Sequence, residues 1–128
     1  MCAMPLLCTQ MAQYEHLPIY KKAMDLAVYI ENVVRAFSRY HKYTIGADLR
    51  NLSREVVRLI IAANSCKDKL QSLTELRDMI EQLKVTIRIC KEVKAFRSFS
   101  SFQCAAGTAV NPSRQSEGWI KSLKQRNS

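Results

Sequence analysis

The residues that most often carry catalysis are few in this chain and lie apart from one another. Its two histidines, His16 and His41, fall near predicted helix ends or in loops, and no Glu-x-x-His pair of a di-metal bundle accompanies them. No serine or cysteine has a nearby histidine to act as its base, and the sequence contains no phosphate-binding loop or dinucleotide fingerprint. Glu75, Asp78 and Glu81 are close in sequence, but helical winding places them on a solvated outward face. We therefore predict that the chain is not an enzyme and needs no metal or cofactor.

The five cysteines are odd in number, widely spaced and without a CxxC pair: Cys2, Cys8, Cys66, Cys90 and Cys104. This spacing does not fit a zinc knuckle or a secreted disulfide framework. Cys90 and Cys104 fall on apolar faces of predicted helices. We interpret the cysteines as reduced, small core residues of a cytoplasmic protein.

Charge offers a different kind of chemistry, because the chain is strongly basic. Lys and Arg number 20 against 11 Asp and Glu, which gives a formal net charge of +9 and a pI of about 9.6. A bias of this size favours polyanionic partners. Nucleic acid comes first among them, before an acidic protein or an anionic membrane surface.

The basic residues gather in three clusters. They are Arg50, Arg54 and Arg58 on one ridge, then Arg77, Lys84, Arg88 and Lys91 beside a core seam, and finally Arg114, Lys121, Lys124 and Arg126. Such clusters can neutralise phosphates and release counterions, with little sequence information. They lack the interleaved aromatic residues that stack single-stranded bases, so contact with the backbone or the shape of a nucleic acid is expected. The alternative is a solvated helical surface, which a single basic pair would favour.

Four predicted helices must position these clusters: residues 18–40, 45–65, 69–96 and 99–124. Each has apolar side chains at steps of three and four residues. The cleanest stripe is Leu73, Leu76, Ile80, Leu83, Ile87 and Cys90. The last helix would place Phe99, Phe102, Ala106, Ala109, Ser113, Ser116, Ile120 and Leu123 on one side. Short connections make neighbouring helices antiparallel, so we predict an all-α, antiparallel up-down four-helix bundle.

This bundle would span residues 18–124 as one domain. Residues 1–17 are expected to form a poorly ordered N-terminal arm, and residues 125–128 a flexible C-terminal tail. The opening segment has no basic region and too short an apolar run for a signal peptide or a membrane span. Met4 and Met11 are further candidate start residues.

A second apolar surface favours self-association. Val85, Ile89 and Val93 lie nearly opposite the core stripe of their helix. The first helix is also apolar outside its main stripe, at Met24, Leu26, Val28 and Val33. One bundle cannot bury both sides, so we predict a homo-oligomer whose interface includes Met24, Val28, Val85, Ile89 and Val93.

Two features mark the last predicted helix. Pro112 removes a backbone donor and clashes with the preceding turn, at a cost of about 3 kcal/mol in a helix interior, so a kink or break is expected near 108–112. Trp119, the only tryptophan, falls at the edge of the predicted core. With Gly118 beside it allowing a neighbouring helix to approach closely, we interpret this stretch as a packing clamp.

Four motifs together resemble the accessory variability determinant (Avd) proteins of diversity-generating retroelements. They are "KYTIGADLRNLSREVVRLIIAANS", "LTELRDMIEQLKVTIRICKEVKAF", "SFSSF" and "RQSEGWIKSL". The likeness covers roughly residues 18–124, and the combination is far more specific than any one piece. The group is similar to a broader four-helix-bundle family that includes proteins encoded in 23S rRNA intervening sequences.

The resemblance implies a non-catalytic, basic, barrel-like homopentamer. It would bind the element's reverse transcriptase and its template-repeat RNA, or an RNA/DNA hybrid, and support mutagenic cDNA synthesis and retrohoming. Carried onto this chain, the basic surface corresponds best to Arg50, Arg54 and Arg58, with the cluster from Arg77 to Lys91 as a further candidate. Two alternatives stay open, a protein of the 23S rRNA intervening-sequence type and a structural oligomer without a nucleic-acid role.

Overall fold

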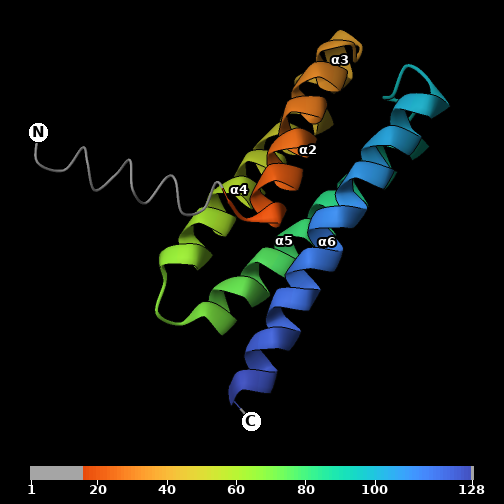
Figure 1. The fold of residues 1–128 in the computed structure, drawn as a ribbon. Helices are drawn as coiled ribbons and strands as arrows, with labels where there is room; N and C mark the ends of the chain where they lie inside the picture. The colour runs from red at the N-terminus through yellow and green to blue at the C-terminus, as the bar shows by residue number, and fades with distance from the viewer. Residues whose placement is uncertain (1–15, 128) are drawn as a thin grey trace, which may run out of the picture.

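A computed structural model describes residues 16–127 of the chain, and four long helices make up most of it (Figure 1). They are α2 (Pro18–Arg35), α4 (Ile45–Ser65), α5 (Lys69–Glu92) and α6 (Phe99–Asn127), with the short α3 (Arg39–Lys42) between the first two. No strand occurs in this part of the chain. Most of the predicted N-terminal arm, with Cys2 and Cys8, and the last residue of the predicted tail lie outside the described residues.

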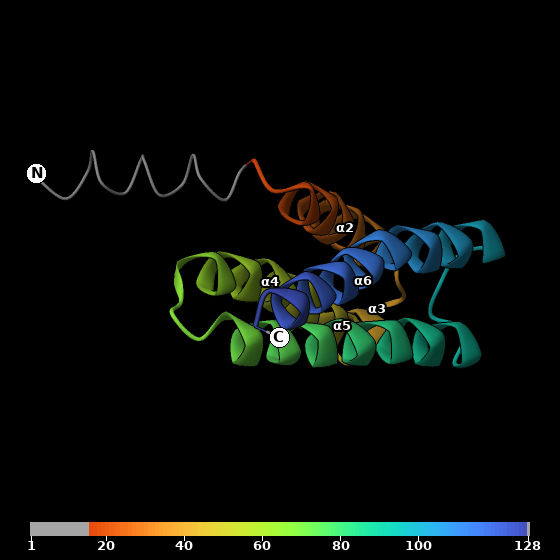
Figure 2. The same ribbon diagram turned by 60° about the horizontal axis from the view of Figure 1, so that its bottom comes forward.

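The four long helices form the predicted antiparallel bundle. α2 and α5 each pack on both α4 and α6, so α2 and α5 lie diagonally across the bundle. Figure 1 and Figure 2 show an elongated molecule, with α3 and the α5–α6 connection at one end and the α4–α5 connection and the C-terminus at the other. The all-α four-helix fold is therefore confirmed.

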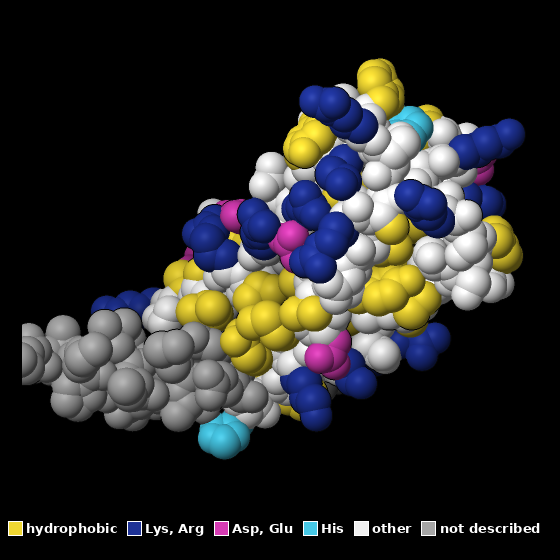
Figure 3. Space-filling view, turned by 90° about the horizontal axis from the view of Figure 1, so that it is seen from above, with side chains coloured by type: hydrophobic (Ala, Val, Ile, Leu, Met, Phe, Trp, Pro, Cys, Tyr) yellow, Lys and Arg dark blue, Asp and Glu magenta, His cyan; other side chains and the backbone are white. Residues whose placement is uncertain are grey.

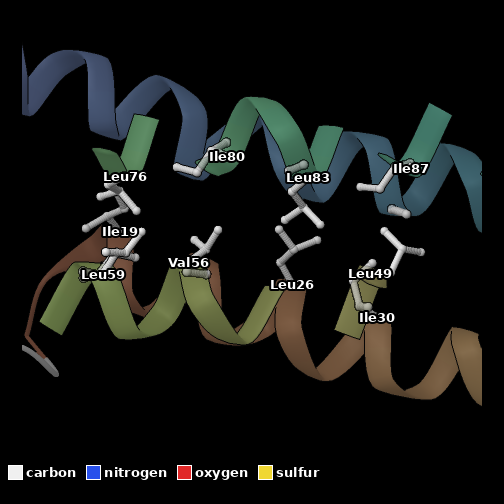
Figure 4. Packing of buried hydrophobic residues seen from close by; sticks show 14 of the residues in the cluster. Ile19, Leu26, Ile30, Leu49, Val56, Leu59, Leu76, Ile80, Leu83 and Ile87 are labelled. Carbon is white, nitrogen blue, oxygen red and sulfur yellow. The ribbon is translucent and has the colours of Figure 1, made fainter. Parts of the chain in front are cut away.

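The core follows the apolar spacing of the sequence most closely on α5. All six residues of its predicted stripe are buried. In Figure 4, Leu83 and Ile87 of this stripe point toward side chains of α2 and α4 such as Leu26 and Leu49. Fully burying a leucine or isoleucine side chain stabilises the fold by about 1.5–3 kcal/mol, so this stripe contributes much of the driving force for assembly of the bundle.

The first helix is shorter than predicted. It ends at Arg35 rather than at residue 40, because the N–H groups of Ala36 and Phe37 donate to Val33 O and Val34 O in a tightened last turn, and extended Ser38 follows. The turn buries Phe37, which meets Phe96 edge to face with ring centroids 5.4 Å apart. A contact between distant parts of the chain therefore decides where α2 stops.

The ends of the last two helices also differ from the prediction. α5 stops at Glu92 rather than at 96, since Lys94 takes a left-handed backbone (φ 62°) and the Ala95 N–H donates to Cys90 O at 2.8 Å. This arrangement satisfies carbonyl groups that the end of a helix leaves free. α6 runs to Asn127, three residues beyond its predicted end.

Of the kink or break expected near 108–112, the break is wrong, because α6 continues through Pro112 from Phe99 to Asn127, while the kink stays a prediction. The buried residues of this helix are Ala105, Ala109, Pro112, Ser116 and Ile120. Pro112 therefore faces the bundle, and its ring fills core space among small neighbours. Burial of the ring offsets part of the cost of the missing backbone donor.

The same helix is rotated relative to the predicted inward face. Phe99, expected inside, is exposed, and Cys104, expected on an apolar face, is exposed as well. The face that packs is centred on Ala105 and Ala109, which turns Cys104 toward α2 and Phe99 toward α5. One residue of α2 differs from the prediction in the other direction. Leu26, expected outside the main apolar stripe, is buried in the core.

Close helix approach occurs at a different glycine from the one expected. Gly118 is exposed, and no heavy atom lies within 4 Å of the place where a Cβ would stand, so the predicted role of Gly118 is wrong. At Gly46, by contrast, a Cβ would lie 2.8 Å from both His41 O and Val34 Cγ1. Gly46 is thus the residue that lets the start of α4 sit against the end of α2.

Trp119 does pack at the edge of the core, as predicted. It is half-buried, contacts the core cluster and borders a cavity of about 350 Å³ together with Leu17, Pro18 and Ile19. On the inward side of the same stretch, Ser116 is buried and its hydroxyl donates to Ser113 O at 2.8 Å. The tryptophan therefore joins the C-terminal part of α6 to the first turn of α2.

Candidate nucleic-acid interface

The ridge on α4 formed by Arg50, Arg54 and Arg58 lies beside α2 and is partly neutralised. The Glu31 carboxylate of α2 pairs with two of these arginines, since its Oε2 lies 3.1 Å from Arg50 Nε and its Oε1 lies 2.5 Å from Arg54 Nη2. The Arg50 Nε and Glu31 Oε1 atoms are shielded from solvent. Arg50 is therefore placed as a link between α2 and α4, and Arg54 is the more exposed member of the pair.

The third arginine of this ridge is held by its own helix. Arg58 donates two hydrogen bonds to the carboxylate of Glu55, and these bonds lower the pKa of Glu55 and raise that of Arg58. Two carboxylates thus offset two of the three positive charges on the ridge. Its electrostatic potential is weaker than the spacing of the arginines suggests.

The cluster on α5 lies along the side of that helix that faces α6. Arg77 is 3.6 Å from Asp78 and 3.8 Å from Glu117 of α6, measured from its Nε to carboxylate oxygens. Lys84 Nζ is 3.0 Å from Glu81 Oε1. Arg88 is exposed and forms no ion pair with any described residue. The acids here are themselves exposed, so each pair is weak in water.

Two cavities open between α5 and α6 along this side. One, of about 290 Å³, is lined by Lys84, Arg88 and Lys91 with apolar side chains of both helices behind them. The other, of about 610 Å³, lies toward the C-terminus, where Arg77 meets Lys121 and Lys124. We call the two cavities and the six basic residues that line them the α5–α6 groove.

The groove joins two clusters that are separate in sequence. Antiparallel packing brings the basic residues of α5 beside Lys121 and Lys124 of α6, and neither lysine of α6 forms an ion pair within the described residues. Arg114 and Arg126 of α6 are exposed but line neither cavity. The α4 ridge lies on the other side of the bundle, against α2, so the three predicted clusters form two surfaces.

Aromatic rings from α6 lie beside the end of the α5–α6 groove that is nearest the connection between these two helices. Lys91 Nζ stands 5.1 Å from the ring centroid of Phe102 and 5.9 Å from that of Phe99. The sequence clusters contain no interleaved aromatics, but the fold supplies them from the neighbouring helix. The attraction between the ammonium group and the rings fixes the lysine at the rim of the cavity.

A basic surface at the α3 end of the bundle escaped the sequence prediction. It combines residues 35–43 with the α5–α6 connection, and it carries Arg35, Arg39, Lys42, Lys94 and Arg97. Figure 3 looks onto this end from above and shows Lys and Arg side chains gathered around exposed hydrophobic ones, with few acidic side chains between them. The part of this surface formed by residues 35–43 could have been predicted, because the sequence has no acidic residue between Glu31 and Asp48.

The candidate interface residues are exposed in two separate places. Val28 is exposed on α2, next to half-buried Met24, while Val85 and Ile89 of α5 form an exposed stripe with Val93, the residue directly after that helix. Because α2 and α5 lie diagonally across the bundle, these two apolar surfaces lie on opposite sides of the molecule.

The acidic and histidine side chains that the structure describes do not gather into a site. Within residues 16–127, no group of three His, Cys, Asp or Glu side chains could hold a metal ion. Glu75, Asp78 and Glu81 are exposed, as the helical winding indicates. No described helix is both long and apolar enough to cross a membrane.

These features define the class of protein: a small, basic, all-helical bundle whose distinguishing surfaces are lined by cations. The chain belongs to the bAvd-like family, whose model matches residues 17–123. The match confirms the resemblance to the Avd accessory proteins of diversity-generating retroelements, and membership implies association with a retroelement reverse transcriptase in general. A search among curated proteins finds no match to the chain.

Proposed function

We propose that this protein is a non-catalytic accessory subunit that binds the reverse transcriptase and the template RNA of its retroelement through its basic surfaces. In doing so it supports mutagenic cDNA synthesis and retrohoming in the cytoplasm. The observation that carries the proposal is the α5–α6 groove, in which six cations converge from two helices. Family membership supplies the partner with which such a surface would work.

The groove suits a polyanion because its charges are arranged along a line. Arg77 and Lys91 are fourteen residues apart on α5, which is about 21 Å of helix. Phosphates that follow this line would displace condensed counterions, and the gain would come without sequence readout. Arg88 and Lys121 are exposed and form no ion pair within the described residues, although Glu117 lines the same cavity as Lys121, so both cations are available to a ligand.

The α4 ridge plays a different part in this proposal. Arg54 and Arg58 are exposed but face carboxylates, so they are better suited to a protein partner that can exchange one ion pair for another. Arg50 is largely committed to Glu31 and contributes mainly to helix packing. We therefore propose that the groove contacts RNA and that the ridge contacts the reverse transcriptase.

Self-association belongs to the same proposal. Two apolar surfaces on opposite sides of one subunit form a head-to-tail contact, in which Val28 of one copy meets the Val85 stripe of the next. Contacts of this kind close into a ring when the rotation between neighbouring copies divides a full turn, and otherwise extend into a filament. We propose a ring-shaped homo-oligomer, and kinship with the family favours five subunits.

Two sets of substitutions test the assignment of partners. The groove variant is Arg88→Glu, Lys121→Glu and Lys124→Glu, and the ridge variant is Arg54→Glu and Arg58→Glu. Arg50 is left unchanged, because a glutamate there would face Glu31 and disturb packing. Each variant is compared with the wild type for RNA binding by gel shift and for co-purification with the reverse transcriptase.

We expect the groove variant to lose RNA binding and the ridge variant to lose the reverse transcriptase, with unchanged helicity in both. RNA binding by the groove variant at wild-type affinity would contradict the RNA assignment. If the wild type bound neither RNA nor reverse transcriptase, a structural oligomer whose charge serves solubility would explain the chain better.

A further inference from the structure

We propose that the α3 end of the bundle is a binding site for single-stranded nucleic acid, in which Tyr40 and Tyr43 stack on bases and the surrounding cations hold phosphates. The α3 end comprises residues 35–44 and 93–98. The inference rests on the proposed nucleic-acid role, and it adds to that role a second site and a preference for unpaired strands.

The two tyrosines are the most exposed large hydrophobic residues described. Tyr40 is 74% exposed and Tyr43 is 70% exposed. Tyr40 lies within α3 and Tyr43 directly after it, and the Thr44 hydroxyl donates to Tyr40 O at 2.8 Å across the turn that follows. Aromatic rings held in water at a turn offer flat surfaces that any base can cover.

Five cations belong to the same end of the bundle as these rings. Arg35, Arg39 and Lys42 come from the end of α2 and from α3, and none of them forms an ion pair within the described residues. Lys94 and Arg97 come from the α5–α6 connection. Basic and aromatic side chains interleave from Arg39 to Tyr43, and the second connection adds two cations to the same end of the bundle, a combination that suits a single strand.

The two connections at the α3 end are tied to each other by direct contacts. Phe37 and Phe96 meet edge to face at 5.4 Å, and Arg97 Nε donates to Ala36 O at 2.7 Å. A platform that is ordered before binding loses less conformational entropy when the ligand arrives. These contacts also explain how residues some sixty positions apart come to share one site.

The backbone of Lys94 is a further sign of function. This residue is the only described non-glycine residue with positive φ, and it occupies a helix end where glycine is the usual choice. A lysine there keeps a cation at the α3 end at the expense of an unfavourable conformation. Strain of this kind points to a role other than stability.

The rings distinguish a single strand from other polyanions. In a duplex the bases are stacked inside and cannot reach Tyr40 and Tyr43, so only the cations would act. An acidic protein would likewise use the charges alone. Stacking should therefore make unpaired nucleic acid the preferred ligand.

The test measures fluorescence anisotropy of the full-length protein with a labelled 15-nucleotide oligothymidylate and with a 15-base-pair DNA duplex. For the double variant Tyr40→Ala, Tyr43→Ala we expect single-strand affinity to fall at least tenfold, because each stacked base contributes roughly 5- to 150-fold. Duplex affinity should change less than twofold. The matched variant Tyr40→Phe, Tyr43→Phe keeps the rings and should retain single-strand binding.

Three outcomes would overturn the inference. An unchanged single-strand affinity in the alanine variant, with intact binding by the wild type, would remove this site while leaving the proposed function in place. Equal displacement of the oligonucleotide by poly-glutamate of the same total charge would indicate a surface for acidic proteins. If the wild type bound neither strand form, the proposed RNA role would fail, and this inference with it.

Discussion

At the scale of single residues, Gly46 shows what one missing side chain permits. The start of α4 lies so close to the end of α2 that a Cβ at this position would meet both a backbone carbonyl and the side chain of Val34. Backbone atoms cannot move away as a flexible side chain can. The two exposed glycines of α6, Gly107 and Gly118, have no neighbour within 4 Å of a Cβ position.

Gly46→Ala should therefore lower the free energy of unfolding by about 1–3 kcal/mol, the usual cost of forcing an extra methyl group into a packed site. Gly118→Ala is the matched control. It should raise the free energy of unfolding by about 0.5–1 kcal/mol, because alanine is the better helix former and nothing obstructs it. Urea denaturation measures both, and an unchanged stability for Gly46→Ala would show that the helices can separate at little cost.

The cysteines differ sharply in their surroundings. Burial, followed by the nearby charge of Asp48, raises the pKa of the Cys90 thiol to about 12. Cys104 is exposed on α6. Because the thiolate is the reactive form, a thiol reagent at pH 8 should label Cys104 in the native protein and leave Cys90 unlabelled until denaturant is added. Peptide mass spectrometry identifies the labelled sites, and rapid native labelling of Cys90 would contradict its burial.

The raised pKa of Cys90 also affects the free energy of unfolding at high pH. Between the ordinary thiol pKa of 9.0 and about 12, Cys90 loses its proton in the unfolded chain and keeps it in the folded one. The unfolded state then binds fewer protons, so the free energy of unfolding falls as pH rises, by up to about 1.4 kcal/mol per pH unit. Cys90→Ala should lack this part of the decline.

At the scale of elements, most departures from regular helix geometry and from the predicted helix bounds lie at the ends of the helices. α5 ends in a left-handed lysine, and α2 ends early so that Phe37 can reach the core. Glu31 joins α2 to α4 through two arginines. Each of these features lies where one element meets another.

Lys94→Gly separates stability from binding. Glycine adopts positive φ without a steric penalty, so the free energy of unfolding should rise by about 1 kcal/mol, while single-strand affinity falls because a cation is lost. Lys94→Ala removes the charge but keeps the strain, and should lose affinity without gaining stability. Thermal unfolding and anisotropy measure the two effects, and a Lys94→Gly variant that binds as well as the wild type would exclude Lys94 from the site.

The sequence predicts elements best where apolar residues are large and regularly spaced. Every residue of the α5 stripe is buried as expected, because leucine and isoleucine at steps of three and four leave one way to pack. The inward face of α6 is harder to predict, since it is built largely from alanine, serine and proline. The weak hydrophobicity of these residues does not determine how the helix is rotated about its axis. The end of α2 depends on Phe96, some sixty residues away, and no local pattern contains that information.

The candidate site, too, depends on contacts between distant parts of the chain that no local pattern contains. Each basic cluster could be read from the sequence, but the groove exists only because α5 and α6 pack side by side. The neutralisation of Arg50 by Glu31 depends in the same way on the packing of α2 against α4. The α3 end combines two connections that are far apart in the chain, so only the fold could bring its rings and charges together.

At the scale of the whole molecule, the chain separates its surfaces by function. The α5–α6 groove, the α4 ridge and the α3 end are basic, while the exposed valines of α2 and α5 are apolar and lie on opposite sides. A subunit built in this way can meet its neighbours through two sides and still present cations to a ligand.

Self-association should depend on the apolar stripe of α5. The variant Val85→Glu, Ile89→Glu places two carboxylates in the proposed contact, where burial without partners is costly, so sedimentation should change from an oligomer to the 14.7 kDa chain. Gln103→Glu, at an exposed position of α6 outside the stripe, is the control and should leave the oligomer intact. A wild-type protein that sediments as a monomer at micromolar concentration would contradict the interface.

The most direct test of the central claim is the salt dependence of binding to the template RNA. Wild-type affinity should fall steeply with salt, and the groove variant Arg88→Glu, Lys121→Glu, Lys124→Glu should bind more weakly, with a slope of log K against log salt that is shallower by roughly 2, since three phosphate contacts are lost. An equal slope and equal affinity for the two proteins would show that the α5–α6 groove does not hold the RNA.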